Sequence, residues 1–215
     1  ILVLAGTQWK DWLPVNAQLS QTLVWPQLVE RGRQVLREEF ADAPLFVLKD
    51  PRICKLADFW IEVLAEENVD PAFVLPIRNP IEVAQSLATR DGIDEARGLL
   101  YWLRYVLAAE AATRGRRRVF TDYAALLTNR EAMASRLSAE LGVIWPRVSA
   151  LSGAEISEFL TPDLRHHVSD TTELDENPAI SPWLRQAYEV LLDWARHGEK
   201  SSDYPILDGI SRAFD

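Results

Sequence analysis

The chain has 215 residues, 48% hydrophobic and 26% charged, with a formal net charge of −9, and its length suits one domain over residues 1–215. The acidic balance argues against a general nucleic-acid binder, because such proteins need many Lys and Arg residues to displace counterions. No apolar run approaches the roughly 20 residues of a membrane-spanning helix, and the single cysteine excludes an internal disulfide framework and predicts a cytoplasmic location.

The first half of the chain predicts helices alternating with short apolar strands. Residues 9–26 show little periodicity and are predicted as loop, whereas apolar residues at helical spacing predict a helix over 28–40. The apolar run at 45–49 ends in a charge and an Asp-Pro pair, which is typical of a buried strand. A helix is expected over 53–67, and a second buried strand over 72–78.

The second half continues the alternation. Asn79 at the N-cap and Pro80 at the first helical position predict a helix to about Arg90. The later expected elements are a long helix over 94–114, a strand over 118–123, a helix to about 141, a short helix near 154–160, a polar stretch over 161–180 and a last helix over 182–197. Short apolar strands between amphipathic helices predict an α/β fold, with a mainly parallel sheet flanked by helices.

Two of the predicted strands end in a cation, Lys49 and Arg78. In an open parallel sheet, ligands bind beyond the carboxyl ends of the strands. A helix start follows Arg78 directly, and a guanidinium beside a helix start suits a phosphate or sulfate. Ser86 borders the apolar face of that helix, so its hydroxyl is within reach of an anion held by Arg78. The alternative is that Arg78 pairs with a carboxylate and Ser86 is an ordinary surface residue.

The segment RNPIEVAQS, from Arg78 to Ser86, resembles the 3′-phosphate-binding motif of the sulfotransferase family. Members of that family transfer a sulfuryl group from 3′-phosphoadenosine 5′-phosphosulfate on a P-loop NTPase-like α/β fold. Three further segments resemble parts of bacterial carbohydrate-type sulfotransferases in the same order: LFVLKDPR at 45–52, RVFTDYAALL at 118–127 and FLTPDLRHH at 159–167. The resemblance implies that Arg78 and Ser86 bind the donor's 3′-phosphate, and that Lys49 is catalytic, close to the transferred group.

Several other residues are candidates for the same site. Arg165, beside the pair of adjacent histidines, is expected either in a loop that closes over the nucleotide or in a solvated polar loop. No third ligand stands at a supporting spacing beside the histidines, so no metal is expected. Arg52 is expected either to contact donor or acceptor, or to pair with a carboxylate at the sheet edge. Trp9 is expected either to stack on the acceptor or to pack in the cleft wall. Asp11 is a candidate for substrate binding and, like Asp50, for the base that takes the acceptor's proton.

One departure from the family concerns the first strand and its glycine-rich loop, which cradles the 5′-phosphosulfate. No such loop is found in the opening ILVLAGTQWK. We therefore expect an N-terminally incomplete sulfotransferase, whose P-loop precedes Ile1 and which does not transfer sulfate in this form. The acceptor is expected to be a small molecule or carbohydrate with a hydroxyl or amine. Two alternatives stay open: a non-catalytic member that binds a nucleotide or partner, and a P-loop kinase-like phosphotransferase, which lacks support because no Mg²⁺-binding carboxylate motif follows a predicted strand.

Overall fold

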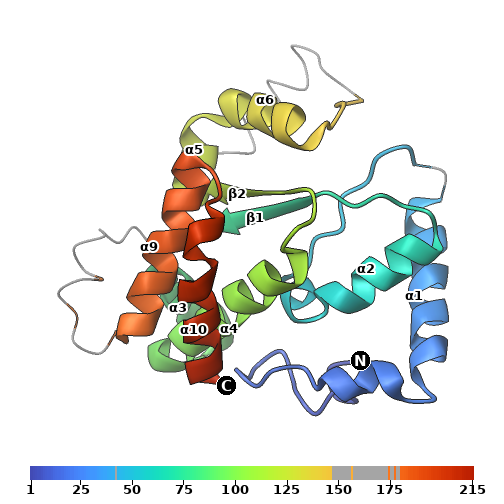
Figure 1. The fold of residues 1–215 in the computed structure, drawn as a ribbon, viewed down its shortest axis with the longest axis horizontal. Helices are drawn as coiled ribbons and strands as arrows, with labels where there is room; N and C mark the ends of the chain where they lie inside the picture. The colour runs from blue at the N-terminus through green and yellow to red at the C-terminus, as the bar shows by residue number, and fades with distance from the viewer. Residues whose placement is uncertain (42, 147–155, 157–173, 175–176, 178–179) are drawn as a thin grey trace. The chain divides into compact units, whose positions relative to one another are not determined.

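The computed structural model describes residues 1–41, 43–146, 156, 174, 177 and 180–215 (Figure 1). The chain divides into two compact units: one comprises Ile1–Ala72, Arg104–Arg116 and Asp215, and the other comprises Phe73–Leu103 and Arg117–Phe214. The expectation of a single domain stays a prediction. Of the helices that the structure describes, none has the length and hydropathy needed to span a bilayer.

The first unit is organised around two packed helices, α1 (Trp25–Phe40) and α2 (Ala57–Glu66). They share an apolar core that includes Val29, Phe59 and Val63. Apolar residues at helical spacing on each segment produce this contact, because each helix can bury its stripe only against the other. The predicted helix over 28–40 is therefore confirmed, with a start three residues earlier than expected.

The strand predicted over 45–49 is wrong, because residues 45–50 have no regular secondary structure. Phe46 stacks on Phe40 at the end of α1, with ring centroids 4.3 Å apart, so this apolar run serves a helical core and not a sheet. Val47 and Lys49 are exposed. Lys49 therefore lies in an irregular segment and not at a strand end.

The helix predicted over 53–67 is confirmed in part, since its first turns form the 3₁₀ helix η2 (Pro51–Lys55) before α2 begins. Asp50 is the N-cap of η2, and its side chain accepts a hydrogen bond from the backbone N–H of Arg52 at 2.8 Å. A second 3₁₀ helix, η1 (Ala17–Gln21), lies within the stretch predicted as loop.

The second unit contains two parallel strands, β1 (Phe73–Ile77) and β2 (Arg118–Asp122). Phe73 lies opposite Arg118, and Ile77 lies opposite Asp122, so both strands end at the same level. The sheet that the described residues form has these two strands, and the rest of the regular structure there is helical. The prediction of an α/β fold is confirmed in this coarse form.

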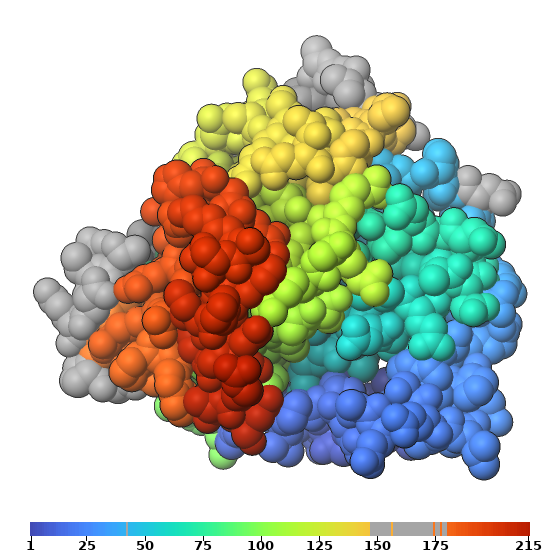
Figure 2. All heavy atoms as spheres, viewed as in Figure 1, coloured from blue at the N-terminus to red at the C-terminus, as the bar shows by residue number. Residues whose placement is uncertain are grey.

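Helices cover this sheet. Trp194 of α9 (Pro182–His197) packs edge-on against Phe120 of β2, with ring centroids 5.1 Å apart. Helix α10 (Tyr204–Phe214) packs along α9, and Figure 2 shows the two helices, orange and red, side by side on the face toward the viewer. The sequence reading missed α10, although its buried residues Leu207 and Ile210 have helical spacing.

The helices that follow β1 keep the predicted order, and α4 contributes residues to both units. The strand–helix junction leads into α3 (Pro80–Asp91), and α4 (Glu95–Thr113) follows it. The helix predicted up to 141 is broken into α5 (Tyr123–Thr128) and α6 (Arg130–Leu141), because Asn129 caps the second of them. The short helix predicted near 154–160 and most of the polar stretch over 161–180 lie outside the described residues.

Gly98 of α4 permits a close approach to α3. A Cβ added at Gly98 would lie 2.8 Å from Cα and 2.9 Å from Cβ of Ala84. We expect Gly98→Ala to lower the free energy of unfolding by about 1–3 kcal/mol, because this overpacking outweighs the better helix propensity of alanine. Gly209→Ala in α10 is the matched control, since a Cβ there meets nothing within 4 Å. Urea unfolding of both variants tests this, and a Gly98→Ala midpoint at or above that of the wild type contradicts it.

Candidate functional site

The carboxyl ends of β1 and β2 place Arg78 and Tyr123 next to each other. Each residue directly follows its strand, and the strands end in register at Ile77 and Asp122. The guanidinium carbon of Arg78 lies 4.8 Å from the centroid of the Tyr123 ring, a cation–π contact. One face of the guanidinium is therefore held by an aromatic ring at the edge where parallel sheets bind ligands.

The backbone at this junction is fixed by two further contacts. The Asn79 side chain accepts a hydrogen bond from the N–H of Ile81 at 2.9 Å, so Asn79 is the N-cap that the sequence predicts. The indole N–H of Trp102 donates to the carbonyl oxygen of Arg78 at 3.1 Å. The turn from strand to helix is thus held on both sides, and the position from which the Arg78 side chain starts is well defined.

Arg78 forms an ion pair with Glu82 on the first turn of α3, with Nε 3.1 Å from Oε2. The Glu82 side chain is 1% exposed and that of Arg78 is 21% exposed. Arg78 therefore does pair with a carboxylate, as one of the two interpretations of the sequence predicts. Among the described residues this pair uses Nε, and no hydrogen bond of the two terminal nitrogens of Arg78 is seen.

Ser86 lies on the same face of α3, one turn beyond Glu82, and is half-buried as the sequence predicts. Arg78 precedes α3, and the rise of the helix from Pro80 to Ser86 is about 9 Å, so Arg78 and Ser86 can share a ligand only if the arginine extends toward Ser86. The contact with Glu82 places Nε of Arg78 beside the first turn of α3. A phosphate-sized anion between the two side chains is consistent with this geometry.

The other cationic candidates belong to the first unit. Lys49 is exposed in the irregular segment described above. Arg52 pairs with Asp50, with Nε 2.7 Å from Oδ1 and Nη2 2.5 Å from Oδ2. Hydrogen bonds from Arg52 lower the pKa of Asp50. Arg52 therefore does pair with a carboxylate, although that carboxylate is two residues away and not on a sheet edge.

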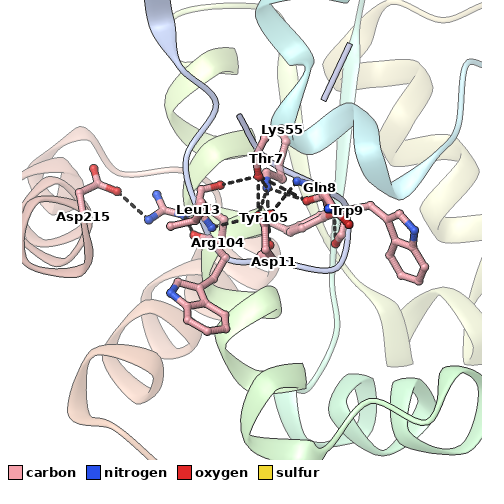
Figure 3. A network of polar contacts seen from close by, with 10 residues as sticks. Thr7, Gln8, Trp9, Asp11, Leu13, Lys55, Arg104, Tyr105 and Asp215 are labelled. Atoms are coloured by element: carbon pink, nitrogen blue, oxygen red, sulfur yellow. Dashed lines mark hydrogen bonds and ion pairs between the residues drawn. The ribbon is translucent and has the colours of Figure 1, made fainter. Parts of the chain in front are cut away.

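Asp11 and Trp9 lie in a loop that a buried lysine holds in place (Figure 3). Lys55 is the last residue of η2, its side chain is 1% exposed, and its Nζ lies 2.9 Å from Oδ1 of Asp11. Nζ also donates to Oγ1 of Thr7 at 2.6 Å and to the carbonyl oxygen of Gln8 at 3.0 Å. The Thr7 hydroxyl in turn donates to Asp11.

Helix α4 supplies two more contacts to this loop. The Tyr105 hydroxyl donates to the carbonyl oxygen of Trp9 at 2.9 Å, and Nε of Arg104 donates to that of Trp12 at 2.7 Å. Figure 3 shows both side chains converging on the loop from the same helix. The Trp9 ring itself is half-buried, with the Lys10 ammonium 4.8 Å from its centroid.

The charge state of Asp11 follows from these contacts. Burial acts to raise the pKa of Asp11, but hydrogen bonds from Thr7, Lys55 and the Gln8 N–H outweigh it and lower the pKa below its usual value. Oδ1 also accepts from the N–H of Leu13 at 3.1 Å, and Oδ2 from that of Gln8 at 2.6 Å. A carboxylate engaged in this way is a weak base, so the arrangement favours a counter-ion role over proton abstraction from an acceptor.

Sequence reasoning missed Lys55 and Thr7. A signal for Lys55 exists, because Lys55, Phe59 and Val63 stand four residues apart, and the last two are buried apolar residues. Arg165 lies outside the described residues. Within the part of the chain that the structure describes, no cluster of three His, Cys, Asp or Glu side chains is arranged to hold a metal ion.

Comparisons of this chain with family models, with curated proteins and with solved structures find no match. The resemblance to sulfotransferases therefore depends on the sequence motifs quoted above. The structure describes three of these four segments, and residues 159–167 lie outside the described residues.

Proposed function

We propose that this chain is a sulfotransferase of the P-loop NTPase-like fold, which transfers a sulfuryl group from 3′-phosphoadenosine 5′-phosphosulfate to an acceptor hydroxyl or amine of a small molecule or carbohydrate. The observation that carries the proposal is the position of Arg78 at the end of β1, where it contacts Glu82 on the first turn of α3, the helix that bears Ser86 one turn further on. A guanidinium with a nearby hydroxyl and helix start suits a terminal phosphate, here the 3′-phosphate of the donor.

The chemistry of the transfer assigns the remaining roles. The acceptor oxygen or nitrogen bonds to sulfur as the bond from sulfur to the bridging oxygen breaks, the acceptor loses its proton to a base, and 3′,5′-adenosine bisphosphate leaves. Such a transfer needs positioning and cations close to the leaving oxygen, by analogy with phosphoryl transfer. Lys49 is our candidate for that cation. We assign no base, because the structure favours the counter-ion role for Asp11.

Titration calorimetry with two nucleotides tests the proposal. We expect 3′,5′-adenosine bisphosphate to bind at least about tenfold more tightly than adenosine 5′-monophosphate, since only the first carries the phosphate that Arg78 and Ser86 contact. Equal affinities for the two nucleotides, or no binding of either, contradict the proposal.

Lys49→Ala is expected to lower kcat and kcat/KM together by roughly a hundredfold, because a cation at the leaving oxygen acts mainly in the transition state. Bisphosphate affinity should stay near that of the wild type. The measurement is transfer from labelled donor to a panel of acceptors by a form that includes the expected upstream P-loop, with the exposed Lys200, which pairs with Asp193, replaced by Ala as the control. An effect confined to the KM for the donor would make Lys49 a binding residue.

The position of Lys49 in an exposed irregular segment favours a second candidate, a non-catalytic protein of the same fold that binds the nucleotide without transferring sulfate. Both candidates predict bisphosphate binding. They differ in the transfer assay on a form that includes the expected upstream P-loop, where the binding protein shows no turnover with any acceptor while its affinity for the bisphosphate still depends on Arg78.

A further inference from the structure

Glu82 is a buried carboxylate within the proposed anion site, and the proposed function gives it no role. Glu82 and Ser86 stand one turn apart on the same face of α3, and Arg78, two residues before the helix begins, contacts Glu82. The Glu82 side chain is almost completely buried, and Arg78 is one of its hydrogen-bond partners. A negative charge thus lies between the two groups that are to hold a phosphate.

This carboxylate has two opposite effects on an anion at Arg78. Its hydrogen bond from Nε holds the guanidinium beside the first turn of α3, which favours binding. Its charge repels a phosphate on the same guanidinium, and burial weakens the solvent screening of that repulsion. Glu82 contacts Nε of Arg78, so a phosphate bound to the two terminal nitrogens does not have to displace Glu82. The phosphate and the Glu82 carboxylate then share the guanidinium of Arg78.

We propose that Glu82 is a built-in counter-ion that limits how tightly Arg78 and Ser86 hold a phosphate, so that the nucleotide product can leave after transfer. The inference rests on the proposed function, because it concerns the same phosphate. Product release limits turnover in many enzymes, and an uncompensated arginine at this position would slow it. Glu82 is therefore a residue that sets the release rate and not one that takes part in the chemical step.

Glu82→Gln isolates the charge, because the amide oxygen still accepts from Nε of Arg78 while the negative charge is lost. We expect this variant to bind 3′,5′-adenosine bisphosphate about tenfold more tightly than the wild type, the scale of removing a like charge from a partly buried site. Titration calorimetry gives the affinity for the bisphosphate and, separately, for inorganic phosphate. Stopped-flow displacement of the bound bisphosphate should show that slower dissociation accounts for the gain.

The control is Glu110→Gln in the first unit. Glu110 pairs with Arg114 at the same i,i+4 spacing, and the exposed fractions, 2% and 25%, nearly match those of Glu82 and Arg78. This variant removes the charge from a comparable pair that is not part of the proposed phosphate site, so its bisphosphate affinity should equal that of the wild type. Should Glu82→Gln fail to fold, Glu82→Met, an uncharged side chain of similar length, is the second variant, with the same expected gain.

Each outcome is decisive. Tighter binding by the Glu82 variants, with unchanged binding by Glu110→Gln, supports the inference, whereas unchanged or weaker binding by the Glu82 variants overturns it. If the wild type binds the bisphosphate through Arg78 but the Glu82 variants show no gain, the proposed function stands and the counter-ion role fails. A gain for inorganic phosphate alone supports the counter-ion role and counts against the nucleotide as ligand. No binding of either probe to any variant overturns both.

Discussion

Lys55→Met is expected to lower the free energy of unfolding by about 3 kcal/mol, the lower end of the range for breaking a buried ion pair. The Lys55 side chain is buried, and Asp11 is 23% exposed, so water solvates the remaining carboxylate only in part. The Gln8 carbonyl and the Thr7 hydroxyl lose the same donor. Urea unfolding followed by tryptophan fluorescence measures the loss.

Two controls separate this effect from a general loss of charge. Lys200→Met removes a lysine from an exposed pair with Asp193 and should unfold like the wild type. Adding Asp11→Asn to Lys55→Met should recover part of the loss, because the partly buried carboxylate no longer lacks its partner. Trypsin should cleave after Lys10 faster in Lys55→Met, since the loop has lost a major anchor. A Lys55→Met midpoint equal to that of the wild type contradicts the role of the network.

The same pair gives stability an acid dependence. The pKa of Asp11 is lower in the folded chain than its usual value, so the contribution of the pair is fully present above that usual value, about pH 4. It is lost as the pH falls through the folded pKa. Between pH 5 and 2 the wild type should therefore lose more stability than Lys55→Met, and parallel curves would contradict this assignment.

Arg78→Ala is expected to weaken bisphosphate binding by about 1.5–3 kcal/mol, the scale of hydrogen bonds to a charged group. Because this variant removes one partner of the buried Glu82, Arg78→Lys is tested alongside it. Lysine keeps the positive charge but lacks the planar guanidinium with its paired N–H donors. Arg78→Lys should therefore retain a substantial part of the loss in bisphosphate affinity. Arg90→Ala, in the last turn of the same helix and paired with Asp91, is the control and should bind normally. Unchanged affinity in both Arg78 variants, with the fold intact, would exclude Arg78 from the site.

The sequence predicts much of the fold where local patterns decide it. Asn79 and Pro80 mark the start of α3, and apolar runs mark β1 and β2. The run at 45–49 misleads because an apolar run indicates burial but not the partner that provides it. Phe46 finds that partner in Phe40, a ring on a helix, and no strand forms.

The contacts of the candidate site residues are likewise only partly predictable from the sequence. The placement of Arg78 at a strand end beside a helix start is predictable, because three adjacent residues carry the signal. The Lys55 network is not, since Thr7 and Asp11 stand more than 40 residues before the lysine that they meet. A buried lysine differs in sequence from a surface lysine only by its spacing to apolar neighbours such as Phe59. Long-range polar pairs of this kind are visible only once the chain is folded.

A double-mutant cycle tests most directly whether Arg78 and Ser86 contact the same phosphate. The wild type, Arg78→Lys, Ser86→Ala and the double variant are titrated with 3′,5′-adenosine bisphosphate and with adenosine 5′-monophosphate. We predict a coupling free energy of about 0.5 kcal/mol or more for the bisphosphate, and none for the monophosphate, because the shared contact is the 3′-phosphate. Additive losses for the bisphosphate, or the same losses for both nucleotides, would contradict the assignment of this site.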